Sequence, residues 1–185
     1  MSELVDTVAG ALYLQIAIVF GGVWHMVAVK RNWLAPLCRP IAENLFGRNK
    51  TWRGLVIVPV LTAIGAVLLF PLEALWPHLG WQSPLNGHSL LLAGLCGGAG
   101  YVLAELPNSW FKRQLGIAPG ETPDQHRWLF LTLDQVDSGI GAALAFMLYP
   151  GIDGLTALVY VLTFPAVALL VKRALFMAKL KSSPA

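Results

Sequence analysis

Apolar residues along this chain fall in long blocks, with few charged residues inside any block. The blocks cover residues 8–29, 55–75, 89–106, 136–149 and 155–171. A helix needs about 20 mainly apolar residues to cross the hydrocarbon core of a bilayer. The pattern therefore predicts an all-α, polytopic integral membrane protein with about five transmembrane helices.

Glycine and proline modify this picture in the third and fourth blocks. The fourth block is the shortest and begins with Gly139 and Gly141, so its helix is expected to be tilted, or broken where it enters the bilayer. Pro107 follows the third block and is expected to end that helix early. The third block also contains four glycines that would let another helix, a ligand or a second copy in a homodimer approach closely: Gly94, Gly97, Gly98 and Gly100.

Composition supports a membrane protein of one domain, residues 1–185. The chain has 185 residues, of which 56% are hydrophobic and 12% charged, with a mean hydropathy of +0.63. A soluble domain is about 25% charged. The two cysteines, Cys38 and Cys96, form neither a disulfide framework nor a zinc motif.

The positions of the 13 lysines and arginines predict an orientation. All of them lie in residues 30–53, 112–127 and 172–181, whereas the N-terminus and the 76–88 and 150–154 segments have none. With five spans these segments alternate, which places the N-terminus outside and the C-terminus in the cytoplasm of a bacterial inner membrane. The sequence pI of about 9.0 favours anionic lipid or phosphate as a partner and gives no support for nucleic-acid binding.

Two aspartates are the most informative polar residues. Asp134 and Asp137 are three residues apart, so they project from the same side of a helix. Two carboxylates this close repel each other unless a cation lies between them. With Glu105, they could bind Mg²⁺ that holds a phosphorylated substrate, while Lys112 and Arg113 hold its phosphates. The alternative is a salt-bridge network that ties a loop to the helices.

A second basic group precedes the second block. Lys50 and Arg53 lie where a helix N-terminus would present backbone N–H groups to an anion. The alternative is a basic cluster that binds lipid head groups. The segment is not a P-loop, because Asn49 occupies the second glycine position of that motif.

Three segments resemble the CDP-archaeol synthase family, which is related to the phosphatidate cytidylyltransferases. They are Phe46-Gly-Arg-Asn-Lys-Thr-Trp-Arg-Gly54, Ser109-Trp-Phe-Lys-Arg-Gln-Leu-Gly-Ile117 and Leu133-Asp-Gln-Val-Asp-Ser138. The resemblance implies a membrane enzyme that condenses CTP with a lipid phosphate, giving a CDP-lipid and pyrophosphate, with Mg²⁺ as cofactor. It implies nucleotide and phosphate contacts at Lys50, Thr51, Arg53, Lys112 and Arg113, metal binding at Asp134 and Asp137, and Ser109 and Ser138 close to the substrates.

The chain departs from the family pattern near Glu105. The family usually has Gly-Asp where this chain has Ala104-Glu105, and Pro107-Asn108 is also unusual. These departures leave room for a paralogue that binds without turnover. The sequence is also compatible with a CTP-dependent lipid kinase, and with a non-enzymatic membrane protein that binds anionic lipid or transports a solute.

Overall fold

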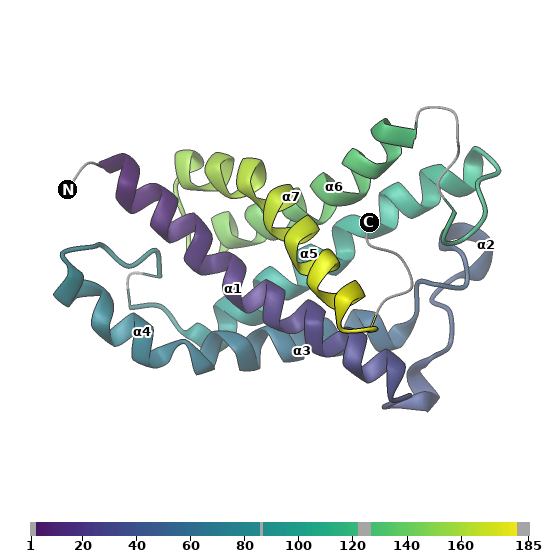
Figure 1. Ribbon diagram of the computed structural model, residues 1–185, viewed down its shortest axis with the longest axis horizontal. Helices are drawn as coiled ribbons and strands as arrows, with labels where there is room; N and C mark the ends of the chain where they lie inside the picture. Colours follow the sequence, from purple (N-terminus) through teal and green to yellow (C-terminus); the bar gives the residue numbers. More distant parts are fainter. Residues whose placement is uncertain (1–2, 86, 122–126, 181–185) are drawn as a thin grey trace.

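The computed structural model of the chain describes residues 3–85, 87–121 and 127–180. Helices form nearly all of the regular structure in these residues (Figure 1). The long helices are α1 (Glu3–Lys30), α3 (Trp52–Leu68), α5 (Leu90–Gln114), α6 (Arg127–Leu148) and α7 (Gly154–Met177). The short ones are α2 (Glu43–Phe46), α4 (Phe70–Leu75) and the 3-10 helices η1 (Ala35–Leu37) and η2 (Trp76–Leu79).

The length and composition of these helices suit a bilayer. Within the described residues, four helices are long and apolar enough to cross a membrane, namely α1, α5, α6 and α7. A fifth span results if α3 and the helical segment that follows it are taken together. The predicted all-α class is therefore confirmed, with four or five potential spans, while the orientation across the membrane stays a prediction.

The second predicted block is a bent pair of helices. The axis turns by 40° between Trp52–Leu68 and Phe70–His78. Pro71 lies in the first turn of α4, where it cannot donate a backbone hydrogen bond to the preceding turn. The proline therefore explains why α3 ends at this point.

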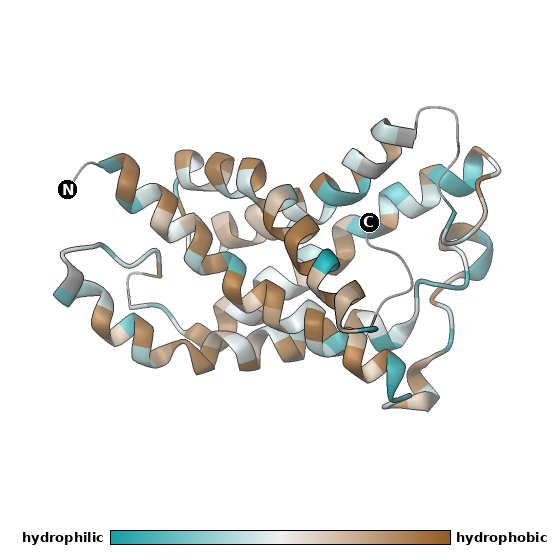
Figure 2. Ribbon diagram, in the orientation of Figure 1, coloured by the Kyte–Doolittle hydropathy of each residue, from teal (hydrophilic) through white to brown (hydrophobic). Residues whose placement is uncertain are grey.

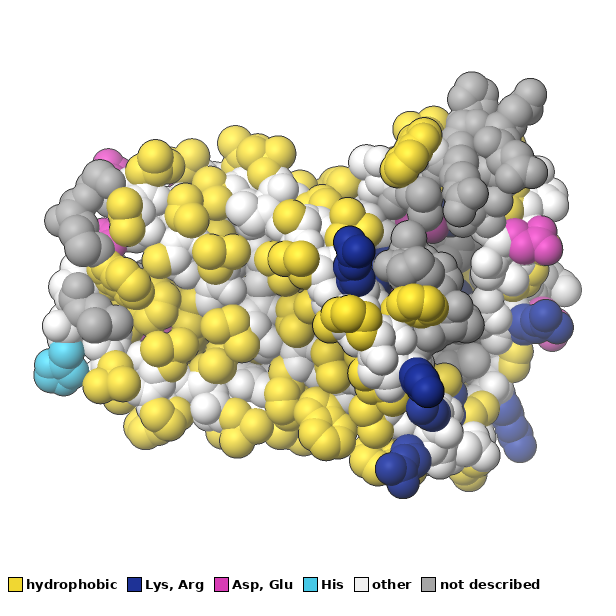
Figure 3. All heavy atoms as spheres, viewed as in Figure 1, with side chains coloured by type: hydrophobic (Ala, Val, Ile, Leu, Met, Phe, Trp, Pro, Cys, Tyr) yellow, Lys and Arg dark blue, Asp and Glu magenta, His cyan; other side chains and the backbone are white. Residues whose placement is uncertain are grey.

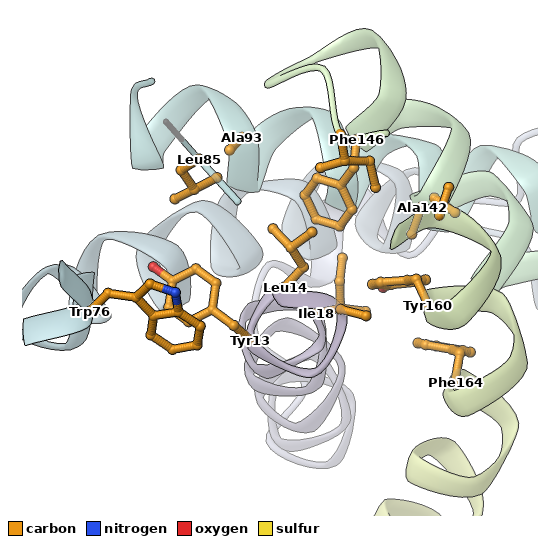
Figure 4. Close-up of a cluster of buried hydrophobic side chains, with 14 residues drawn as sticks. Tyr13, Leu14, Ile18, Trp76, Leu85, Ala93, Ala142, Phe146, Tyr160 and Phe164 are labelled. Carbon is orange, nitrogen blue, oxygen red and sulfur yellow. The ribbon is translucent and has the colours of Figure 1, made fainter. Parts of the chain in front are cut away.

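The long helices pack as a closed ring. In order around the ring, α1 contacts α3, α3 contacts α5, α5 contacts α6, α6 contacts α7, and α7 returns to α1. Figure 4 shows Leu14 and Ile18 of α1 pointing toward Phe146 of α6 and Tyr160 of α7. Aromatic rings fill much of this core, and Tyr160 is fully buried.

The outer surface of the ring is apolar. Leu162 and Leu170 on α7 are 68% and 69% exposed. Figure 2 shows hydrophobic residues along the middle of the helices, with hydrophilic residues gathered mainly at the ends, and Figure 3 shows hydrophobic side chains over much of one face of the molecule. Such an inverted pattern, with large apolar side chains facing outward, is expected where the surrounding medium is lipid.

Small residues allow α5 to lie between α3 and α6. A Cβ atom at Gly94 would lie 2.5 Å from the Cα of Ala63, and one at Gly98 would lie 2.7 Å from the Cα of Pro59, both on α3. Gly97 and Gly100 are in equally close contact with α6. The glycines of the third block therefore serve packing within the chain, and a homodimer stays a prediction that these glycines do not support.

We expect Gly98→Ala to destabilise the protein by about 1–3 kcal/mol, because its new methyl group meets the backbone of α3. Gly22→Ala is the matched control, because a Cβ at this helical position meets no atom within 4 Å. The measurement is the thermal midpoint in detergent. Equal midpoints for the two variants would contradict this account of the packing.

Two predicted helix boundaries are wrong. Helix α5 passes through Pro107 and continues to Gln114, because side chains of its second half bond to α6 and stabilise the added turns. Helix α6 begins near Arg127, well before the expected start, and runs unbroken through Gly139 and Gly141. Both glycines are packing contacts, Gly139 against Phe164 and Gly141 against α5, and neither interrupts the helix.

Basic side chains gather at one end of the ring. They occupy the last turns of α1 and α5, the C-terminal half of α7, the start of α3 and the segment between α1 and α3. Figure 3 shows Lys and Arg in one half of this face, from just past its middle to that end, and no described Lys or Arg in the other half. Lys181 lies outside the described residues, as does the side chain of Arg127.

Candidate functional site

Polar side chains of α5 and α6 face each other near the basic end. Glu105, Asn108 and Lys112 follow the i, i+3, i+7 spacing of one helix face. Asp134 and Asp137 form the corresponding stripe on α6. Since α5 and α6 are in contact along their length, the two stripes meet.

Lys112 and Asp134 form an ion pair in which the lysine is buried. The Nζ of Lys112 lies 2.5 Å and 2.6 Å from the two carboxylate oxygens of Asp134. Lys112 is only 8% exposed, and its Nζ also lies 5.8 Å from the centre of the Phe130 ring. A lysine this buried requires a negative partner, and Asp134 supplies it.

Asn108 lies between the two aspartates. Its Nδ2 donates to Oδ1 of Asp134 and to Oδ2 of Asp137, each at 2.7 Å. An amide NH₂ has two hydrogens, and both are used here. The amide therefore holds together two carboxylates that would otherwise repel each other.

A second ion pair joins α5 to the segment before α3. Lys50 Nζ contacts Oε2 of Glu105, and the other oxygen of Glu105 lies 3.2 Å from Oγ of Ser138. Ser138 is also within hydrogen-bonding distance of Asp137. The result is a continuous polar network through Lys50, Glu105, Ser138, Asp137, Asn108, Asp134 and Lys112.

The chain segment before α3 doubles back to bring Lys50 to this network. The backbone N–H of Ile41 donates to the carbonyl of Lys50, and that of Trp52 donates to the carbonyl of Arg39. Gly47 has a φ of +84°, which favours glycine at this turn. Helix α2, at the tip of the segment, packs on α5.

The network lines a charged pocket of about 240 Å³. Acidic and basic side chains both line it, namely Glu105, Asp134, Asp137, Lys50, Lys112 and Arg113. Arg113 differs from the two lysines, because its Nη2 donates only to the backbone carbonyl of Ala118. Its Nε and Nη1 are buried without a hydrogen-bond partner among the described residues, so the pocket holds a cation that lacks an anion.

A second pocket of about 280 Å³ lies beside the first, between α1, α3, α5 and α7. Its walls are mainly apolar and include Ile18, Val19, Val58, Phe164, Ala168 and Val171. Polar side chains also line it, among them His25, Thr51 and Lys172. Both pockets share Asn49, Lys50 and Glu105, so the Lys50–Glu105 pair lies where they adjoin.

The remaining predicted residues differ in whether they line one of these pockets. Ser109 lines the charged pocket. Thr51 lines the apolar pocket and caps α3, with its hydroxyl oxygen 3.4 Å from the Gly54 nitrogen. Arg53 lines neither pocket, since its Nη1 points to the carbonyl of Trp33 at 3.4 Å, and its phosphate contact stays a prediction.

The predicted metal ligands lie close together, but their carboxylate oxygens already bond to nitrogen donors of other side chains. Within the described residues, no group of three His, Cys, Asp or Glu side chains is arranged to hold a metal ion. Asp134 and Asp137 are joined through Asn108, while Glu105 is paired with Lys50.

Sequence reasoning missed Asn108 and Lys172 and gave no site role to His25. Asn108 could have been found, because it lies three residues after Glu105 and four before Lys112 on the same helix face. It was overlooked because Pro107 was expected to end the helix. His25 and Lys172 lie on α1 and α7, and no local pattern predicts that these helices face a common pocket.

Comparison of the chain with family models, with curated proteins and with solved structures found no match.

Proposed function

We propose that this chain is an integral membrane cytidylyltransferase, which transfers the cytidylyl group of CTP to a membrane lipid phosphate and releases pyrophosphate. The observation that supports this most directly is the adjoining pair of pockets, one charged and one apolar, with Lys50 and Glu105 in the lining of both. A reaction between a water-soluble nucleotide and an amphiphile requires these two environments side by side. The choice of CTP among nucleotides rests on the three sequence motifs.

The charged pocket suits a metal–triphosphate complex. Mg²⁺ is usually bound through one or two carboxylates together with substrate phosphates and water, so a third acidic ligand is not required. Asp134 and Asp137 are the oxygen donors that would hold it, with Asn108 between them. Arg113 offers two nitrogens without a partner, and guanidinium groups bind phosphate well.

The apolar pocket suits the hydrocarbon part of the acceptor. Its walls include α1 and α7, whose outer faces would contact lipid. His25, Lys50, Thr51 and Lys172 supply positive or hydrogen-bonding groups on the same pocket. This arrangement fits an amphiphile with an anionic head, whose phosphate would lie toward Lys50 and the charged pocket.

In the proposed reaction, an oxygen of the lipid phosphate forms a bond to the α-phosphorus of CTP. The bond from that phosphorus to the oxygen bridging the β-phosphorus breaks, and pyrophosphate leaves. A phosphate dianion is already a nucleophile, so the protein contributes positioning and charge stabilisation. Lys112 and Arg113 are placed to offset charge on the triphosphate, and Lys50 to orient the acceptor. Bound Mg²⁺ would neutralise charge on the leaving group.

We infer that the charged pocket faces the cytoplasm of a bacterial inner membrane, with the N-terminus outside. The basic side chains at the same end as this pocket support the inference, because cytoplasmic segments are enriched in Lys and Arg. Soluble CTP would then reach the pocket directly.

A second candidate is a protein that binds anionic lipid without turnover. Lys112 and Lys50 are each already paired with a carboxylate, so the network is satisfied without any nucleotide. On this account the apolar pocket binds the lipid, and the two aspartates only join α5 to α6.

Thermal stability in detergent separates the two candidates. We expect CTP with Mg²⁺ to stabilise the protein by about 2.7 kcal/mol at a concentration 100 times Kd, and CTP with excess chelator to give a much smaller effect. ATP with Mg²⁺ is the control for base selectivity. Stabilisation by lipid phosphate but not by CTP would favour the lipid-binding protein.

A further inference from the structure

Nitrogen donors hold the Asp134–Asp137 pair from both sides. Asn108 Nδ2 lies 2.7 Å from one oxygen of each aspartate, and Lys112 Nζ lies 2.5 Å and 2.6 Å from the oxygens of Asp134. These two groups do for the aspartates what a metal ion would do, because they bind carboxylate oxygens that otherwise repel each other.

Arg113 is the cation of this pocket that has no carboxylate partner among the described residues. It lines the pocket with buried Nε and Nη1 atoms that have no acceptor there, while its Nη2 donates only to the Ala118 carbonyl. Buried donor nitrogens without an acceptor are unfavourable, so this group independently indicates a negatively charged ligand. A divalent cation with a phosphate chain would satisfy Arg113 and replace the nitrogen donors on the aspartates at the same time.

We propose that Asn108 is a metal ligand in the nucleotide-bound protein and a substitute for the metal in its absence. When the ion binds, the amide turns about χ2 so that Oδ1 faces the ion in place of Nδ2. Lys112 leaves Asp134 at the same step and binds the phosphates. The inference rests on the proposed function and adds to it one ligand and the exchange of Lys112 between two partners.

The exchange requires little movement. The two ends of an asparagine amide have nearly the same shape, so a half-turn about χ2 replaces a donor with an acceptor in the same place. Amide oxygens are ordinary ligands of hard divalent cations. The lysine ammonium group is a compact charge on a flexible stem, which allows it to move from carboxylate to phosphate.

Binding of Mn²⁺ to the full-length protein in detergent tests the role of Asn108 without any turnover. Bound Mn²⁺ is measured by loss of the EPR signal of the free ion. We expect Asn108→Ala to weaken binding at least about tenfold, because an oxygen ligand is lost. If Asn108 only joined the aspartates, its removal would free both carboxylates, and affinity would stay the same or rise; that result overturns the proposal.

Two further variants keep the test decisive. Asn108→Asp retains an oxygen and should bind Mn²⁺ at least as tightly as the unaltered protein, so weak binding by this variant also contradicts the proposal. Gln114→Ala is the matched control, because it removes an exposed amide from the same helix that lines neither pocket, and it should leave Mn²⁺ affinity within about twofold. Thermal midpoints of all variants show that each is folded.

The role of Lys112 is tested by comparing Lys112→Met with Arg113→Met. Both changes remove one positive charge from the pocket, but only Lys112 contacts Asp134. Without CTP, we expect Lys112→Met to bind Mn²⁺ about tenfold more tightly than the unaltered protein, and Arg113→Met to show no such gain. Both variants should bind Mn²⁺–CTP more weakly than the unaltered protein. Equal effects on Mn²⁺ alone would overturn the exchange of Lys112.

The outcomes separate this inference from the proposed function. Normal Mn²⁺–CTP binding by Asn108→Ala removes the inference and leaves the cytidylyltransferase proposal intact. No Mn²⁺ binding by the unaltered protein, with or without CTP, removes both.

Discussion

Asp137→Asn should lower turnover about a thousandfold while the protein remains folded. The carboxylate is one of the two that would hold the metal, and charge stabilisation by a metal amounts to several kcal/mol, where each 1.36 kcal/mol is a factor of ten. The fold should survive because the new side-chain oxygen can accept from Asn108, while the new NH₂ group donates to the Ser138 hydroxyl. Single-turnover kinetics with CTP and lipid phosphate is the measurement.

Asp153→Asn is the matched control at the opposite end of the helices. Asp153 caps α7, and its hydrogen bonds, first among them that from the Thr156 hydroxyl, hold the pKa of its carboxyl below the usual value. Asparagine is an equally good cap, so this variant should keep both stability and turnover near neutral pH. Turnover by Asp137→Asn within tenfold of this control would remove Asp137 from the mechanism.

Gly22→Leu should raise the KM for the lipid phosphate about ten- to hundredfold and leave CTP binding unchanged. Gly22 lines the apolar pocket, and a Cβ at this position meets no atom within 4 Å, so the new side chain enters open space. Filling space that a ligand chain needs costs about 1–3 kcal/mol, as overpacking does in a core. The charged pocket does not include Gly22, so nucleotide binding should be unaffected.

Gly154→Leu provides the comparison for this effect. A Cβ at Gly154, at the start of α7, also meets no atom within 4 Å, but this residue does not line the apolar pocket. Equal KM values for the two variants would show that the lipid chain lies elsewhere. Weakened CTP binding by Gly22→Leu would contradict the division into two pockets.

The helical class could be predicted from sequence because the long apolar blocks are typical of membrane-spanning helices. The ends of the helices were harder to predict from sequence, since they depend on contacts between helices. Pro107 normally ends a helix, yet α5 continues because Asn108 and Lys112 bond to α6 across the interface. The glycines of α6 could not be recognised as packing contacts without knowing that Gly141 lies against α5.

The candidate site could be predicted from sequence only where its residues share a local pattern. The spacing of Asp134 and Asp137 predicted one helix face, and they do lie on one face. The pairing of Lys50 with Glu105 joins residues 55 positions apart, and no local rule predicts such a contact. Arg53 looked equivalent to Lys50 in sequence, but it points toward Trp33.

Transfer of label from CTP to lipid tests the central claim most directly. Purified protein in detergent would be incubated with α-labelled CTP, Mg²⁺ and a panel of phosphatidic acid, its ether analogues and polyprenyl phosphates. The account predicts label in the lipid phase of at least one acceptor, with an equal amount of pyrophosphate released. Absence of label with every acceptor together with no CTP binding, or release of CDP without pyrophosphate, would contradict it.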